Sequence, residues 1–250
     1  IWGDLYFRLD TGSQAGNVVQ KIASTQRAFR RLHIVFPRYS RLPVLSGRSC
    51  SQLTSLSLSK VEFVGSSTEL PQLPRLQRLT LTECRLPALG LFYALSCKLP
   101  ALVDLEIVRA TSPQAEALNV ETYNIFDSFG LLKGLTRLQL GSCKLLAIPQ
   151  WLSGLAKLRE LYLDGNEGLL GRGAVPAPGL RRLSHLSGLI LLSLARCSLG
   201  GVPAELRALT SLRALDLSGN AFKDAAPPAA CMENLTHLTS LTSLNLACCL

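Results

Sequence analysis

The chain has 250 residues, of which 48% are hydrophobic and 17% charged, a composition that excludes an intrinsically disordered chain and allows a substantial core. The formal net charge is +9, but residues 1–60 carry +7 of it, with nine basic and two acidic side chains, and the rest of the chain is nearly neutral. A continuous phosphate-binding stripe, and with it a nucleic-acid partner, is therefore not expected.

Residues 1–28 form a leader that precedes the repetitive part of the chain. We expect Trp2, Leu5 and Phe7 to form a strand that caps the exposed end of the structure that follows. Residues 20–31 combine long polar side chains with interspersed apolar ones, which predicts a helix that leads into the first repeat.

From residue 29 onward one pattern recurs: a leucine, two variable residues, a second leucine, one variable residue and a third aliphatic residue. The nine copies begin at Phe29, Leu53, Leu76, Leu102, Leu135, Leu158, Leu189, Leu212 and Leu241. Alternation at the second and third anchors is the two-residue period of a β-strand, with the leucines on one face. One such strand cannot bury its leucine face alone, so the copies predict parallel strands stacked over a shared leucine core.

Eight residues after the first anchor, a small side chain with a hydrogen-bond donor recurs. The position is occupied by Cys84, Cys143, Asn166, Cys197, Asn220 and Cys249. We expect the strand to end there in a turn, where the side chain hydrogen-bonds to the backbone of a neighbouring turn. Pro37, Val61 and Ala110 lack the donor, so the turns at these three residues are expected to be less well held.

The segments that return from one strand to the next carry their own signals. Residues 148–155 and 202–209 each contain a proline followed by a helix-compatible stretch, which predicts a short helix in each. The longest intervals contain insertions, interpreted as loops on the convex side or at the edge, at residues 111–134, 168–188 and 221–240. The last copy ends at Leu250 without a polar cap, so the array is expected to continue beyond it.

The clearest copies are Leu-Arg-Glu-Leu-Tyr-Leu-Asp-Gly-Asn at 158–166 and Leu-Arg-Ala-Leu-Asp-Leu-Ser-Gly-Asn at 212–220. Over residues 29–250 the pattern resembles the leucine-rich repeat superfamily in its form of about 23 residues. The resemblance implies an α/β solenoid, or horseshoe, with a parallel sheet on the concave side and short helices or turns on the convex side. It also implies that the concave sheet binds protein. The expected organisation is a leader or N-terminal cap over 1–28 and an array of about nine repeats over 29–250.

The leader carries a second resemblance. The segment Ile-Trp-Gly-Asp-Leu-Tyr-Phe at 1–7 is similar to the closing part of an F-box, in which a tryptophan shortly before a leucine follows a helical bundle. This resemblance implies that the leader is the end of an F-box, that the missing upstream part docks a Skp1-type adaptor of a ubiquitin ligase, and that the repeats receive its substrate.

The sequence lacks the patterns of the common catalytic and metal sites. It contains no C-x-x-C, H-E-x-x-H, phosphate-binding loop or G-x-S-x-G motif, so we predict no enzyme activity, no catalytic residue, no metal and no cofactor. No apolar run is long enough for a membrane span. Four of the eight cysteines occupy the turn position, where they must remain thiols, which favours a reducing compartment and an intracellular location, cytoplasmic or nuclear.

Side chains that point outward from the strands are the expected binding surface, because the pleat directs them away from the core. The residues predicted to bind a partner are Arg78, Asp104, Glu106, Arg109, Arg137, Gln139, Glu160, Tyr162, Asp164, Arg196 and Asp216. Tyr162 lies among charged residues of neighbouring strands, a composition that binding hot spots favour.

The predicted function is a non-catalytic protein–protein interaction module, in its specific form the substrate receptor of an F-box ubiquitin-ligase subunit. Two alternatives are open: the ectodomain of an extracellular leucine-rich repeat receptor, and a regulatory scaffold for a phosphatase, nuclease or GTPase.

Overall fold

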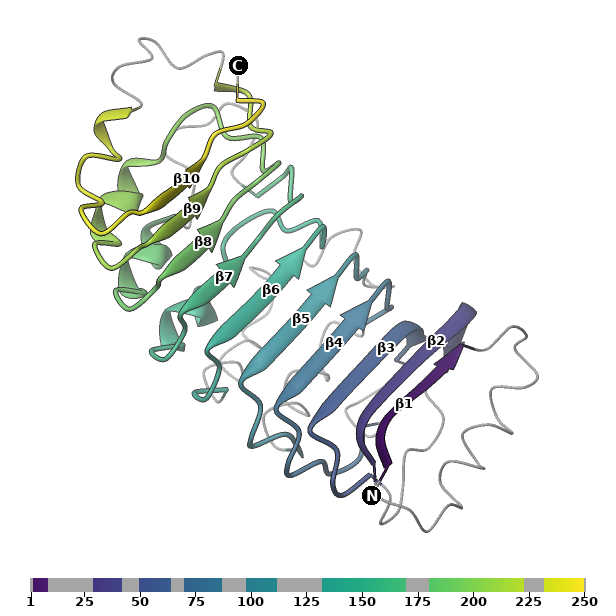
Figure 1. Cartoon of the computed structure of the whole chain (residues 1–250). Coiled ribbons are helices and arrows are strands. Elements are labelled where there is room, and N and C mark those ends of the chain that lie inside the picture. Colours follow the sequence, from purple (N-terminus) through teal and green to yellow (C-terminus); the bar gives the residue numbers. More distant parts are fainter. Residues whose placement is uncertain are drawn as a thin grey trace. The chain divides into compact units, whose positions relative to one another are not determined.

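A computed structural model of the chain describes residues 2–8, 29–41, 50–63, 70–86, 98–111, 132–169, 180–222 and 232–249. The chain divides into two compact units, Ile1–Glu116 and Ala117–Leu250. Within the described residues of each unit, every strand is parallel to its neighbour and the strands follow one another in chain order (Figure 1).

The first unit contains the longer strands. They are β1 Trp2–Arg8, β2 Phe29–Arg41, β3 Ser55–Glu62, β4 Arg78–Thr82 and β5 Asp104–Val108. Parallel pairing requires a return segment between successive strands, and each leucine copy supplies a strand and a return in turn.

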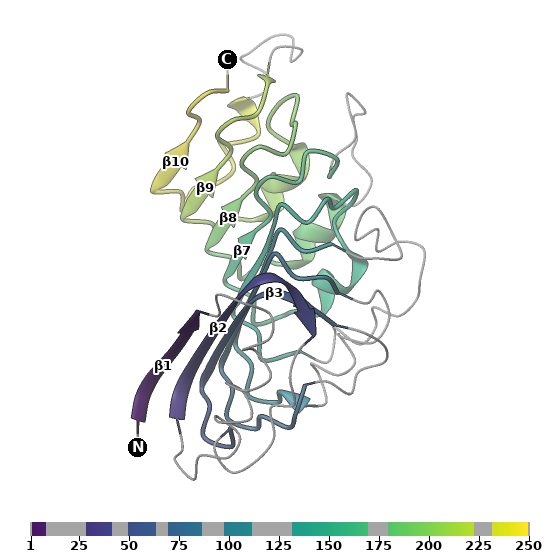
Figure 2. The same ribbon diagram turned by 90° about the vertical axis from the view of Figure 1, so that its right-hand side faces the viewer.

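The second unit combines short strands with short 3₁₀ helices. Its elements are β6 Arg137–Gly141, η3 Gln150–Gly154, β7 Glu160–Tyr162, η4 Leu180–His185, β8 Leu191–Ser193, η5 Ala204–Ala208, β9 Ala214–Asp216 and β10 Ser243–Asn245. The helices lie on one side of this unit's sheet (Figure 2). Pro149 and Pro203 are the N-caps of η3 and η5, so the two predicted short helices are confirmed.

The leucine anchors form the core. In β3 and β4, Leu56, Leu58, Leu79 and Leu81 are fully buried, and cross-strand register places like anchors side by side. Burial of each leucine side chain contributes about 1.5–3 kcal/mol before the entropy of ordering the chain is counted. The anchors of the last copy are exceptions: Leu244 in β10 is 41% exposed, and Leu241 and Leu246 are partly exposed, because β9 is the only described strand neighbour of β10.

The segment that resembles the end of an F-box is the strand β1. Its Trp2, Leu5 and Phe7 align with Phe29, Leu32 and Ile34 of β2, and Leu5 and Phe7 are partly buried. The spacing of these three side chains is that of a repeat with aromatic residues in place of two leucines. The predicted strand is present as β1, next to β2 at the edge of the first unit's sheet. The expected helix over 20–31 is wrong from Phe29 onward, where β2 begins; residues 20–28 lie outside the described residues.

The turns without a donor side chain differ from expectation. At Pro37 there is no turn, because β2 continues to Arg41 through a register shift between Val35 and Ser40, the kind of irregularity that accommodates a proline without an N–H. Val61 also lies within a strand, β3, rather than in a turn, and Ala110 follows β5; both side chains are buried. Backbone pairing holds this region, since the N–H of Arg85 donates to the carbonyl of Val61 at 2.9 Å.

Little of the three insertions can be compared with expectation. Residues 112–131, 170–179 and 223–231 lie outside the described part of the chain. The described end of the second insertion contains the helix η4.

Candidate functional site on the open face of the sheet

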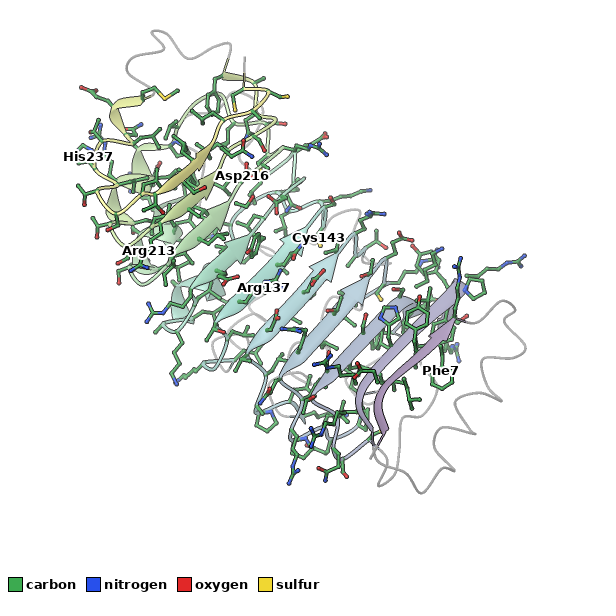
Figure 3. All side chains as sticks on the ribbon, viewed as in Figure 1. Phe7, Arg137, Cys143, Arg213, Asp216 and His237 are labelled. Carbon is green, nitrogen blue, oxygen red and sulfur yellow. The ribbon has the colours of Figure 1, made fainter. Side chains whose placement is uncertain are left out.

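The side of the sheet that faces away from the leucine core is named here the open face. In the second unit it carries two rows of side chains, each row running across successive strands. The first row is Arg137, Glu160, Leu191, Ala214 and Ser243, and the second row is Gln139, Tyr162, Ser193, Asp216 and Asn245. Arg137 and Asp216 are visible on this face in Figure 3.

Tyr162 is the centre of a network on this face. The guanidinium of Arg137 lies 4.9 Å from the ring centroid of Tyr162, and its Nε lies 3.5 Å from Oε2 of Glu160. The Tyr162 hydroxyl donates to the same Glu160 oxygen at 3.1 Å, and Arg137 also donates to Gln139 at 3.0 Å. Burial, and secondarily the Glu160 charge, raises the pKa of Tyr162, so the phenol stays protonated and donates at neutral pH. The charged neighbours therefore fix the position of the aromatic ring in the unbound protein.

Apolar side chains lie in the row beside that of Tyr162, diagonally across from it. Leu191 pairs in register with Glu160, and Ala214 follows it on β9; both are partly exposed on the open face. The prediction from sequence omitted both residues. The available signal was a leucine at the outward position of the copy Leu189, Leu192, Leu194, where other copies have polar residues. A partly exposed leucine near a tyrosine, with polar side chains around both, is the arrangement typical of a binding hot spot.

Carboxylates dominate the charge around this apolar centre. Ser193 donates to Asp164, and Asn245 donates to Asp216 at 3.2 Å. Glu160, Asp164 and Asp216 carry three negative charges against the one positive charge of Arg137, which leaves the centre net negative. Asp164 follows β7 and lies in the turn after it.

The open face of the first unit has two corresponding rows. They are Asp4, Arg31, Ser55, Arg78 and Asp104, and Tyr6, His33, Ser57, Thr80 and Glu106. Charges in the first of these rows are paired: Arg78 Nε donates to Asp104 at 2.7 Å, and Arg31 lies 3.4 Å from Asp4. The rings of Tyr6 and His33 stack at 4.6 Å, and partial burial lowers the pKa of His33.

Two predicted binding residues lie at strand ends and have an unusual backbone. Arg109 and Arg196 have φ of 52° and 54°, in the left-handed region. Each lies one residue before the turn position of its repeat. We name this preceding residue the left-handed position. The other members are Lys60, Glu83, Ser142, Gly165, Gly219 and Cys248. Arg109 donates to Glu83 at 3.0 Å.

The predicted residues thus fall into two groups. Arg78, Asp104, Glu106 and Arg109 belong to the first unit. The group in the second unit is Arg137, Gln139, Glu160, Tyr162, Asp164, Arg196 and Asp216. Within the second group the structure brings Arg137, Gln139, Glu160 and Tyr162 into one network.

The turn position builds a ladder of buried polar groups under the strand ends. Asn166 accepts from the N–H groups of Cys143 and Leu145 and donates to two carbonyls. Asn220 makes the corresponding four hydrogen bonds in a later repeat. Cys197 donates to the carbonyl of Leu163 at 3.2 Å. This arrangement, with stacked parallel strands and buried leucine anchors, defines a leucine-rich repeat protein.

Comparison with known proteins agrees with this class. No family model matches the chain. The chain is 30% identical over 217 residues to human Toll-like receptor 9, a match that covers 76% of this chain and 20% of that protein. Its fold is similar to that in the structure of the Toll–Spatzle complex of Drosophila, with a TM-score of 0.65 and 15% identity over 98% of this chain and 30% of that one. The chain belongs to the leucine-rich repeat superfamily, and it spans about a fifth of the length of the curated relative it matches.

The predicted intracellular location is wrong. Both matches are with proteins of the Toll type, whose receptor arrays are extracellular or endosomal. The cysteine argument failed for a physical reason: Cys84, Cys197 and Cys249 are buried under the strands and donate to backbone carbonyls, and a thiol enclosed in this way is protected from oxidation in any compartment.

The comparisons give no support to the F-box hypothesis or to a Skp1-type adaptor. Within the described residues, no helix is long and apolar enough to cross a membrane. The same part of the chain contains no group of three or more potential metal ligands.

Proposed function

We propose that this chain is a segment of the ligand-binding repeat array of a receptor, that it has no catalytic activity, and that it binds a protein partner on the open face. The names of its relatives support a receptor, and the Toll–Spatzle complex is an assembly of such an array with a partner. This proposal replaces the F-box hypothesis with the alternative of an extracellular receptor.

The observation that carries the proposal is the Tyr162 network. Arg137 and Glu160 fix an aromatic ring, and the partly exposed Leu191 lies on the next strand, opposite Glu160 and diagonal to Tyr162, with hydrogen-bonded polar groups around them. Side chains that are already ordered lose little conformational entropy on binding, so less of the favourable contact free energy is offset.

The charge of this centre indicates the partner's chemistry. With three carboxylates and one guanidinium around an apolar core, it suits a protein segment that presents an apolar side chain next to a lysine or arginine. We place the principal contacts on Arg137, Gln139, Glu160, Tyr162, Asp164 and Asp216. Arg196 at the strand end belongs to the same unit, and Arg78, Asp104, Glu106 and Arg109 would form a separate contact surface on the first unit.

The test uses the whole chain, produced as a secreted protein, against a panel of purified extracellular proteins. For a binder, Tyr162→Ala and Leu191→Ser should each weaken the affinity about 30-fold, as loss of a hot-spot side chain does. His237→Ala is the control, because His237 is exposed and lies away from the open face (Figure 3). Equal affinity of the Tyr162 and control variants for every binder would overturn the proposal.

A further inference from the structure

The ends of the strands in the first unit carry a second charged surface. The last residues of β2 and β3, Arg41 and Glu62, pair with each other, and the cross-strand ladder continues from Glu62 to Arg85 and from Arg85 to Thr111. Next to it, Glu83 at the left-handed position lies 3.9 Å from Lys60 and 3.0 Å from Arg109, and Glu62 lies 3.3 Å from Arg85. Each glutamate in this region is therefore already neutralised by a basic neighbour.

Three arginines near these strand ends are exposed and have no side-chain partner among the described residues: Arg8, Arg38 and Arg41. Arg8 ends β1, and the other two lie on the last part of β2. Within residues 1–60 the acidic side chains are Asp4 and Asp10, and Asp4 is paired with Arg31. These arginines thus account for much of the charge of +7 that this part of the sequence carries.

We name this surface the basic rim. It consists of Arg8, Arg38, Arg41, Lys60, Arg85 and Arg109, with Glu62 and Glu83 between them. Its net charge of +4 contrasts with the net negative centre around Tyr162, so the two surfaces select opposite partners.

We propose that the basic rim binds a sulfated polysaccharide. Guanidinium groups pair with oxyanions through two parallel hydrogen bonds, and unpaired, exposed arginines can do so without breaking an existing contact. Strands lie about 4.8 Å apart, so a linear polyanion laid across the strand ends meets a new side chain at each strand.

Two features favour a sulfated polysaccharide over a nucleic acid. The guanidinium of Arg85 lies 4.1 Å from the ring centroid of Tyr39, the aromatic residue at the rim, and occupies one face of the ring, so a base could stack only on the other face. Glu62 and Glu83 interrupt the positive row, which disfavours an evenly charged phosphate backbone. A polysaccharide with unevenly placed sulfates can pair with the arginines and avoid the carboxylates.

The test is titration of the whole chain with a size-defined heparin oligosaccharide at low and physiological ionic strength. The variant Arg8→Ala with Arg38→Ala and Arg41→Ala should weaken binding about 10- to 100-fold, because it removes three charge-assisted contacts. The matched control removes three exposed basic side chains of the second unit, by Lys157→Ala with Arg181→Ala and Arg213→Ala, and should change the affinity less than about twofold.

Further arms separate the possible causes. Replacement of the same three arginines by lysine keeps the charge and should give an intermediate loss, which identifies guanidinium recognition. Equal weakening by both alanine triples would show that only net charge matters and would overturn the proposal. So would equal binding of desulfated heparin, or tighter binding of duplex DNA of comparable charge. Because none of the substituted residues lies in the Tyr162 network, failure here leaves the receptor proposal untouched.

Discussion

Asn166 and Asn220 make the same four hydrogen bonds in two different repeats: each side-chain oxygen accepts two backbone N–H groups from the preceding repeat, at 2.9 and 3.1 Å, and each amide nitrogen donates to two carbonyls. Both asparagines are fully buried. The repeated geometry shows that this side chain substitutes for backbone pairing where the strands end.

Replacing Asn166 with alanine should therefore be among the most destabilising single changes in the second unit. It removes four hydrogen bonds to buried backbone groups, of which the Leu163 carbonyl still accepts from Cys197, and we expect a loss of about 3–5 kcal/mol in the free energy of unfolding. Cys197→Ala is the control, because its thiol makes only weak hydrogen bonds; it should cost about 1 kcal/mol. Urea denaturation measures both, and equal losses would contradict the role assigned to the asparagine.

Gly219 should resist substitution because of its backbone and its neighbour. Its φ is +69°, and a Cβ there would lie 2.8 Å from Cγ of Arg196. We expect Gly219→Ala to cost about 1–2 kcal/mol, and Gly219→Asn less, since asparagine tolerates the left-handed region. Gly200→Ala is the matched control: a Cβ there meets nothing within 4 Å, and its effect should stay within about 0.5 kcal/mol. Thermal unfolding of the three variants distinguishes them.

The buried thiols should make the chain lose stability in alkali. Burial raises the pKa of Cys84 to about 11 and that of Cys197 to about 12. Below about pH 8.5 both states hold these protons, so stability is unaffected; above it the unfolded chain releases them while the folded chain retains them, and the free energy of unfolding falls up to the folded pKa values.

The measurement compares urea unfolding near pH 7 and pH 10 for the native chain and Cys197→Ala. The variant should lose less stability between the two pH values. In the folded chain, iodoacetamide should modify the exposed Cys248 and spare Cys197. Rapid modification of Cys197 without unfolding would show that its thiol is not enclosed.

The ion pair of Arg78 with Asp104 should contribute more than the pair of Arg31 with Asp4 in the same row. The Asp104 side chain is only 10% exposed, whereas both side chains of the Asp4 pair are about two-thirds exposed. A double-mutant cycle with Arg78→Met and Asp104→Asn should give a coupling energy of about 1 kcal/mol, against about 0.5 kcal/mol or less for the exposed pair. Equal couplings would mean that burial has no effect here.

The core was predictable from the sequence because the leucine spacing specifies it directly. A two-residue alternation fixes which side chains point inward, so the spacing alone places Leu56, Leu58, Leu161 and Leu163 in the core, where all four are fully buried. β1 was harder to recognise as a repeat, because Trp2 and Phe7 stand where leucines are expected. The continuation of β2 through Pro37 depends on a local register shift that no spacing reveals.

The open face was only partly predictable. Its residues followed from alternation, but their partners depend on register between repeats of unequal length, and on side-chain conformations. Glu160 forms contacts with both Arg137 and Tyr162, and Arg109 lies at a strand end with a left-handed backbone; neither arrangement has a sequence signature in a single chain. The prediction of an intracellular location is wrong because it uses the cysteines at the turn position as evidence for a reducing compartment, although burial protects such thiols in any compartment.

The left-handed position accepts very different side chains, from Gly165 to Lys60, Glu83 and Arg196. Its backbone is specified by the turn, and the side chain projects beyond the core, so one residue per repeat can be exchanged without repacking leucines. Single substitutions at this position can therefore add or remove surface charge. A new binding surface along the strand ends could be designed by substituting this residue in successive repeats.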